Sequence, residues 1–117
     1  MDLALTRILF TQNMAAMLAF YRDVLGLALL IDEPGFKEFT PAPAASALHN
    51  GRSRVGVRPP KLVFWSADVA TAREILSARG ARLEKVIVGS GLTRCEGKDP
   101  DGNPYQISNR GYSGAQQ

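Results

Sequence analysis

A unit of roughly 50 residues occurs twice along the chain, and this duplication constrains the fold more than any other feature of the sequence. Thr6 and Lys61, which open similar apolar segments, lie 55 positions apart. Asn13 and Asp68, the expected helix N-caps, are also 55 apart, and the two glycines that end these helices are 54 apart. We infer two copies of one supersecondary unit. A single copy would leave one face of its sheet uncovered, so we expect the copies to pair or the chain to dimerise.

Each copy is predicted to contain a strand, a helix and three more strands. For the first copy we expect strands over 3–11, 27–32, 36–40 and 45–49, and a helix over 14–25. For the second we expect strands over 61–66, 83–88, 92–96 and 105–109, and a helix over 69–79. The predicted fold class is α+β. We place module 1 at about 1–51, a connector at 52–60, module 2 at about 61–110 and a tail at 111–117, all in one domain.

The last strand follows a turn with a distinctive composition, Asp99-Pro-Asp-Gly-Asn103. Pro100 fixes one backbone angle, and Gly102 and Asn103 tolerate positive φ. We therefore expect Asp99 and Asp101 to serve the turn. The strand that follows carries Gln106, whose amide either contacts a ligand or makes a structural hydrogen bond.

Composition excludes several classes of protein. The net charge of +3 is mildly basic, and no basic run with interleaved aromatics or nucleic-acid motif is present. The single cysteine, Cys95, excludes an intrachain disulfide and is expected to be a small packed residue. No segment is long and apolar enough to span a membrane, and the first residues show no signal-peptide pattern, so we expect a cytoplasmic protein.

Three stretches in order resemble the vicinal-oxygen-chelate superfamily, which includes glyoxalase I, bleomycin-resistance proteins and extradiol dioxygenases. They are Asn13 to Leu27 with its Phe-Tyr-Arg-Asp-Val-Leu-Gly ending, Lys61 to Asp68, and Asp99 to Ile107. The resemblance implies paired βαβββ modules whose sheets curl into a cup that holds a small ligand. It also implies that many members are homodimers, with cups formed between subunits.

The resemblance also implies four metal-ligand positions on strands that face the cup. In this chain they fall on Thr6, Ala47, Lys61 and Gln106, none of which is a usual strong ligand in this combination. Lys61 would place a cation at the metal position, and the chain has only one histidine. We therefore expect no metal cofactor.

Alternation along the strands predicts which side chains face the cup. Leu62, Phe64 and Tyr105 should face the helices or a dimer partner. Phe10 and Trp65 either stack on a ligand or pack in the core, and His49 either lies at the rim or in a surface turn. The expected ligand-binding residues are Thr6, Ile8, Phe10, Ala47, His49, Lys61, Val63, Trp65, Gln106 and Ser108.

Two residues are candidates for proton transfer. Lys61 either binds an anionic group, acts as a base or points into solvent. Glu38 is a possible general base, but it and its neighbour Lys37 cannot both point into the cup.

Three functions follow as hypotheses. The first is a protein without metal that binds a small hydrophobic or aromatic compound, including an anionic one. The second is a metal-independent lyase, isomerase or dioxygenase-type enzyme, and the third an interaction module without a ligand. No nucleic-acid or membrane partner is expected.

Overall fold

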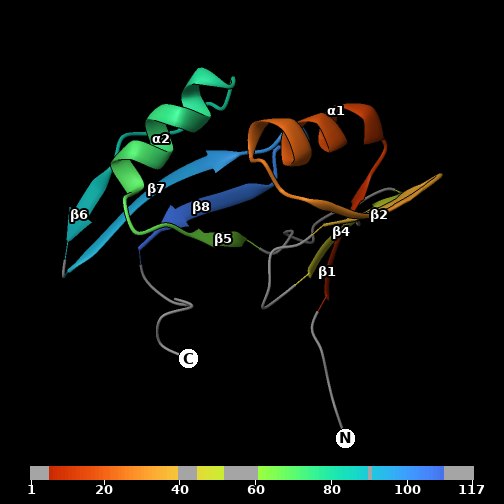
Figure 1. The fold of residues 1–117 in the computed structure, drawn as a ribbon, viewed down its shortest axis with the longest axis horizontal. Helices are drawn as coiled ribbons and strands as arrows, with labels where there is room; N and C mark the ends of the chain where they lie inside the picture. Colours follow the sequence, from red (N-terminus) through yellow and green to blue (C-terminus); the bar gives the residue numbers. More distant parts are fainter. Residues whose placement is uncertain (1–5, 40–44, 52–60, 90, 110–117) are drawn as a thin grey trace, which may run out of the picture. The chain divides into compact units, whose positions relative to one another are not determined.

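A computed structural model describes residues 6–39, 45–51, 61–89 and 91–109. The chain divides into two compact units, Met1–Pro59 and Pro60–Gln117. Each unit contains one mixed four-stranded sheet, and along the chain its elements follow one another as a strand, a helical segment and three more strands (Figure 1). This arrangement confirms the predicted α+β class. The predicted connector over 52–60 and tail over 111–117 lie outside the described residues.

In the first unit the sheet order is β1-β4-β3-β2. The pair β1–β4 is parallel and the other two pairs are antiparallel. The strands are β1 (Thr6–Thr11), β2 (Leu29–Glu33), β3 (Phe36–Phe39) and β4 (Ala45–Asn50).

The helical segment of this unit differs from the single α-helix predicted over 14–25. It comprises α1 (Met14–Leu18) and a π-helix, η1 (Ala19–Val24). The wider turn is continued by the Leu25 N–H, which donates to the Phe20 carbonyl five residues back. Phe20 and its neighbour Tyr21 are both buried, and their rings meet edge to face at 5.2 Å.

Asn13 occupies the N-cap position of α1, as predicted, but its side chain makes no capping hydrogen bond. Instead, the Asn13 N–H donates to Oγ1 of buried Thr11 at 2.9 Å. The hydroxyl at the end of β1 therefore fixes the entry to α1.

In the second unit the order is β5-β8-β7-β6, with β5–β8 parallel. The predicted cap of α2 (Val69–Ala78) is confirmed, since Asp68 Oδ1 accepts the Thr71 N–H at 3.0 Å. The strands are β5 (Leu62–Trp65), β6 (Ile87–Gly89), β7 (Leu92–Lys98) and β8 (Pro104–Ser108).

The prediction of a strand over residues 83–88 is wrong for most of that range. Only a bridge between Leu83 and Gly97 precedes the short strand β6. Arg73 on α2 donates to the carbonyls of Leu83 (3.0 Å) and Glu84 (2.8 Å). These carbonyls are therefore satisfied by a side chain and need no neighbouring strand.

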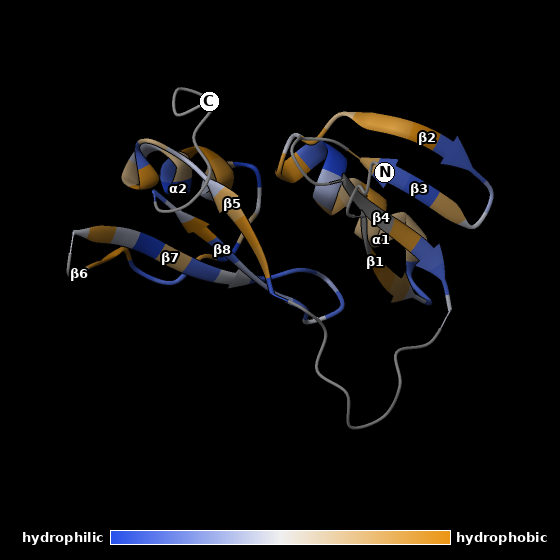
Figure 2. Ribbon diagram, turned by 90° about the horizontal axis from the view of Figure 1, so that it is seen from below, coloured by the Kyte–Doolittle hydropathy of each residue, from blue (hydrophilic) through white to orange (hydrophobic). Residues whose placement is uncertain are grey.

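Each helical segment covers one face of its own sheet, and alternation along the strands divides core from open face. In the second unit the helix face is buried and includes Leu62, Tyr105 and Cys95, in agreement with the sequence. Burial raises the pKa of the Cys95 thiol, as expected for a residue that is packed in the core. Figure 2 shows that β5 is hydrophobic over most of its length, whereas hydrophobic and hydrophilic residues alternate along β7.

Candidate functional site

Three polar side chains meet on the open face of the second unit. Lys61 Nζ donates to Glu96 Oε1 at 2.5 Å, and Gln106 Nε2 donates to Glu96 Oε2 at 2.6 Å. Glu96 and Gln106 are opposite each other on β7 and β8, and Lys61 immediately precedes β5. We call Lys61, Glu96 and Gln106 the polar triad.

The triad holds a charged carboxylate at a partly covered position. The Glu96 side chain is 28% exposed. Burial by itself raises the pKa of Glu96. The hydrogen bonds from Lys61 and Gln106, together with the positive charges of Lys61 and Arg94, outweigh this effect and hold the pKa below its usual value of 4.5. Glu96 is therefore ionised at neutral pH, with each of its oxygens already accepting one hydrogen bond.

Apolar side chains lie beside the triad on the same face. Val63 pairs with Gln106 in the parallel register, and Trp65 pairs with Ser108. Val63 is 51% exposed and Trp65 45%. Ser108, also predicted to contact ligand, occupies the same row but is only 2% exposed, so it adds almost nothing to the open surface.

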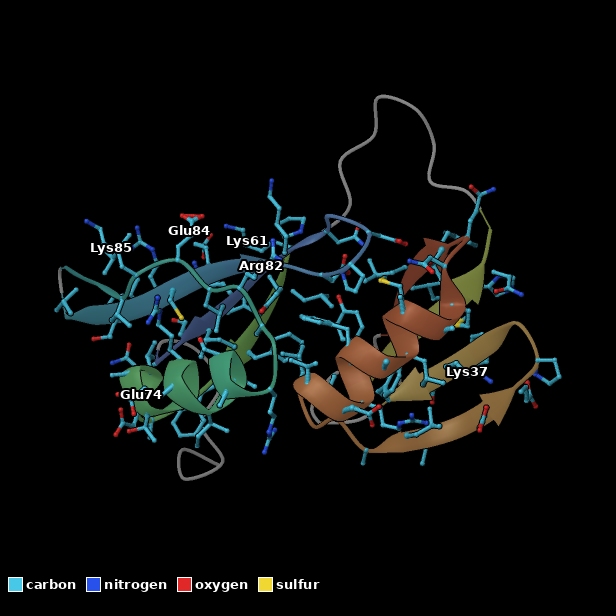
Figure 3. The ribbon with its side chains drawn as sticks, turned by 90° about the horizontal axis from the view of Figure 1, so that it is seen from above. Lys37, Lys61, Glu74, Arg82, Glu84 and Lys85 are labelled. Carbon is cyan, nitrogen blue, oxygen red and sulfur yellow. The ribbon has the colours of Figure 1, made fainter. Side chains whose placement is uncertain are left out.

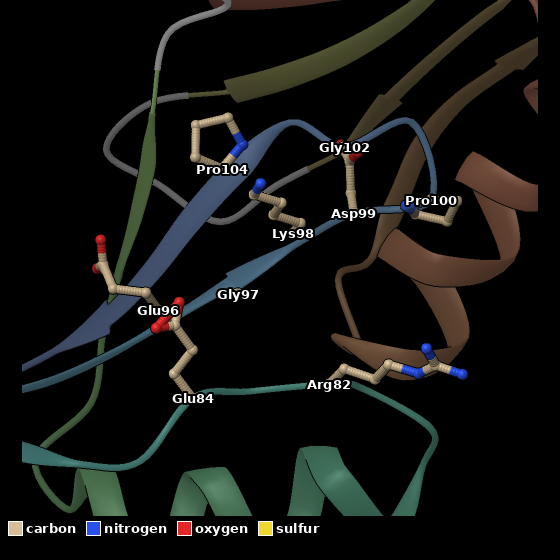
Figure 4. A pocket seen from close by; sticks show the side chains of 9 residues that line it. All are labelled: Arg82, Glu84, Glu96, Gly97, Lys98, Asp99, Pro100, Gly102 and Pro104. Carbon is tan, nitrogen blue, oxygen red and sulfur yellow. The ribbon is translucent and has the colours of Figure 1, made fainter.

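A depression of 580 Å³ lies at the end of this sheet, next to the β7–β8 turn (Figure 4). It reaches Glu96 but includes neither Val63 nor Trp65. Figure 3 shows that Lys61, Arg82 and Glu84 project from the same side of this unit, away from Glu74 on α2. The residues that line the depression are Arg82, Glu84, Glu96, Gly97, Lys98, Asp99, Pro100, Gly102 and Pro104.

The open face of the first unit carries three rings on adjacent strands. His49 on β4 pairs with Phe10 on β1 and with Phe36 on β3. The ring centroids are 5.4 Å apart for Phe10–His49 and 6.0 Å apart for Phe36–His49. We call Phe10, His49 and Phe36 the ring cluster. Ile8 and Phe10, two residues apart on β1, are 44% and 46% exposed.

The register decides which of Lys37 and Glu38 shares this face. Lys37 pairs with buried Leu48 and forms an ion pair with Asp32. Glu38, two residues after Phe36, therefore lies on the same face as the ring cluster. The predicted residues Thr6 and Ala47 lie in β1 and β4, where Ala47 is the register partner of both Ile8 and Glu38.

The sequence interpretation missed Glu96 and Phe36. A signal for Glu96 was available in the Asp99–Asn103 turn, which closes the hairpin by pairing Lys98 with Pro104. Counting back two residues on each strand pairs Glu96 with Gln106. Phe36 could have been found from Glu38, because residues two apart share a face.

Within residues 6–39, 45–51, 61–89 and 91–109, histidine, cysteine, aspartate and glutamate form no group of three or more placed to hold a metal ion. None of the helices in this part of the chain has the length and hydropathy of a membrane span.

Several solved structures have the same fold as this chain. Lactoylglutathione lyase from Agrobacterium tumefaciens is 21% identical, with a TM-score of 0.73 over 92% of each chain. TnmS3, an antibiotic binding protein from Streptomyces sp. CB03234, is 20% identical, with a TM-score of 0.74 over 92% of this chain and 94% of that one. A glyoxalase/bleomycin resistance protein/dioxygenase from Nocardioides is 19% identical, with a TM-score of 0.76 over 92% and 83%.

The sequence itself establishes the family. Comparison with curated proteins finds no match. The family model for the glyoxalase/bleomycin resistance protein/dioxygenase superfamily matches residues 3–107, which is nearly the whole chain. The chain therefore belongs to the glyoxalase/bleomycin resistance protein/dioxygenase superfamily.

Proposed function

We propose that the protein binds a small planar, hydrophobic or aromatic compound on the open faces of its sheets and uses no metal ion. One observation carries this proposal: large apolar side chains remain half exposed there, beside ordered hydrogen-bonding groups. They are Ile8, Phe10, Val63 and Trp65. That TnmS3, with the same fold, is an antibiotic binding protein adds support.

The energetic basis is burial of apolar surface. Ligand sites are concave and mostly apolar, with a few polar groups that orient the ligand. Each square ångström of apolar surface removed from water contributes roughly 25 cal/mol. Val63 and Trp65 offer such surface next to the polar triad, whose hydrogen bonds hold Glu96 in place. Lys61 and Arg94 add positive charge close to Glu96, which favours compounds with an anionic substituent.

The donor set argues against the divalent ion of the metal enzymes in this family. Two of the four expected ligand positions are Lys61 and Gln106, and both direct N–H donors at Glu96. A lysine ammonium has no lone pair to offer a metal, and its charge repels a cation. Elemental analysis after incubation with Ni²⁺, Zn²⁺, Fe²⁺ or Mn²⁺ should show no stoichiometric metal. One tightly held ion per chain would overturn this part of the proposal.

The proposal includes a homodimer, because each sheet leaves a face with half-exposed apolar side chains. Sedimentation velocity should give twice the chain mass of 12.7 kDa. A monomer would contradict the proposed homodimer but would not contradict the proposed ligand binding.

Trp65 reports on ligand binding because it is the only tryptophan. We expect its emission to change on titration with naphthalene, indole or 1-naphthoate. Val63→Asp should weaken binding at least about tenfold, since it places a charge on the contact surface. Val88→Asp is the matched control, because Val88 is 73% exposed and pairs with Thr93 on the helix side.

Two results would contradict the proposal. One is the absence of an emission change with every compound. The other is equal binding by both variants. A Val63→Asp variant that changed only the sedimentation behaviour would instead indicate an interface between protein chains.

A further inference from the structure

His49 is held in a defined orientation within the ring cluster. Its imidazole lies between the rings of Phe10 and Phe36, at centroid distances of 5.4 and 6.0 Å. Its Nδ1 is 2.7 Å from the Asn50 carbonyl oxygen. Two neighbouring strands and one backbone carbonyl therefore fix the ring, although His49 is exposed.

This contact determines the tautomer of the neutral ring. A carbonyl oxygen only accepts hydrogen bonds, so Nδ1 must carry the proton. The lone pair of the neutral imidazole is then on Nε2. Among the described residues, the side-chain hydrogen bond of His49 involves Nδ1, which leaves Nε2 as an acceptor next to the rings of Phe10 and Phe36.

The charged residues that the described strands place on this face are both carboxylates. The register places Glu38 on β3 and Glu33 on β2 on the same face as Phe36, and β1 contributes Ile8 and Phe10 there. Ionised carboxylates accept hydrogen bonds but do not donate them. Within residues 6–39, 45–51, 61–89 and 91–109 no side chain donates to Nε2, so a bound molecule can supply a donor there.

We propose that His49 Nε2 accepts a hydrogen bond from an O–H or N–H group of a planar aromatic ligand lying against Phe10 and Phe36. This inference rests on the proposed function and narrows its ligand to phenol-like or indole-like compounds. A ligand that carries an O–H or N–H group should therefore bind more tightly than the same ring system without one.

The test compares two probes that differ in one donor, 2-naphthol and 2-methoxynaphthalene. Their dissociation constants are measured by calorimetry at neutral pH. Wild-type protein should prefer 2-naphthol about five- to tenfold, as one hydrogen bond implies. The preference should vanish in His49→Phe, which keeps a ring at this position.

A second measurement does not depend on the variant folding. The chain has a single histidine, so its side-chain nitrogen resonances are unambiguous. The Nε2 resonance should shift with 2-naphthol and much less with 2-methoxynaphthalene.

The outcomes separate the inference from the proposed function. Equal affinity for both probes, or a preference that survives in His49→Phe, overturns the inference and leaves the proposed function standing. Binding of neither probe, nor of the compounds used with Trp65, overturns both.

Discussion

Asp99 is the residue on which the second hairpin depends most. Its carboxylate is buried, and Oδ1 accepts the N–H groups of Asp101 and Asn103 at 2.9 Å each. Oδ2 accepts the Asn103 side-chain amide at 2.8 Å. One side chain thus closes the turn that sets the β7–β8 register, and with it the pairing of Glu96 with Gln106.

Replacing Asp99 should destabilise the protein. We expect Asp99→Ala to lower the free energy of unfolding by roughly 2–4 kcal/mol, because three hydrogen bonds to a buried carboxylate are lost. Asp101→Ala is the control, because Asp101 is exposed and donates to Asp99 through its backbone N–H, which alanine retains. Urea denaturation of both variants would measure the difference. Equal losses would mean that the Asp99 side chain does not hold the turn.

Glu96 should make stability depend on pH. Its pKa in the folded protein is depressed, so its contribution is present above the usual carboxyl value of 4.5 and is lost as pH falls through the lower, folded value. The advantage of wild type over Glu96→Gln should therefore be larger at pH 7 than at about pH 3. Denaturation at both pH values tests this, with exposed Glu84→Gln as control. An advantage that grew in acid would contradict the depressed pKa.

At the scale of elements, β7 and β8 pack too closely for a side chain at Gly97. A Cβ there would lie 2.7 Å from the Tyr105 ring and 2.9 Å from Leu83. Gly89 in β6 has nothing within 4 Å of the corresponding position. Both glycines are in strands of the same sheet, so a substitution at Gly89 is a matched control for the same substitution at Gly97.

Gly97→Ala should cost roughly 1–3 kcal/mol of stability, the usual range for overpacking a core. Gly89→Ala should change stability by less than about 0.5 kcal/mol. Thermal unfolding of the two variants gives the comparison directly. Two equally stable variants would show that Tyr105 and Leu83 can move aside.

The order and type of most elements could be predicted because hydrophobic periodicity and turn residues are local signals. The β7–β8 hairpin follows from Asp99, Gly102 and Asn103 in this way. Other features depend on distant partners. Nothing near residues 83–86 in the sequence indicates that Arg73 takes two of their carbonyls, and the π-helical turn depends on how Phe20 and Tyr21 fit the core.

At the scale of the whole molecule, the sequence duplication corresponds to two units with the same element order. The candidate site was only partly predictable at this scale. Alternation placed Phe10, Val63 and Trp65 on open faces, since it needs only the strand period. It could not give the polar triad, which requires Gln106 on β8 and Lys61, just before β5, to converge on Glu96 in β7.

The most direct test of the central claim is an assigned ¹H–¹⁵N correlation spectrum recorded during titration with 2-naphthol. The open-face account predicts that the largest amide shifts fall on β1, β3, β4, β5 and β8, around Phe10, His49 and Trp65. The helix-side residues Ala72 and Leu76 on α2 should shift little. Shifts concentrated on α2, or no shifts at any concentration, would contradict ligand binding at the open faces.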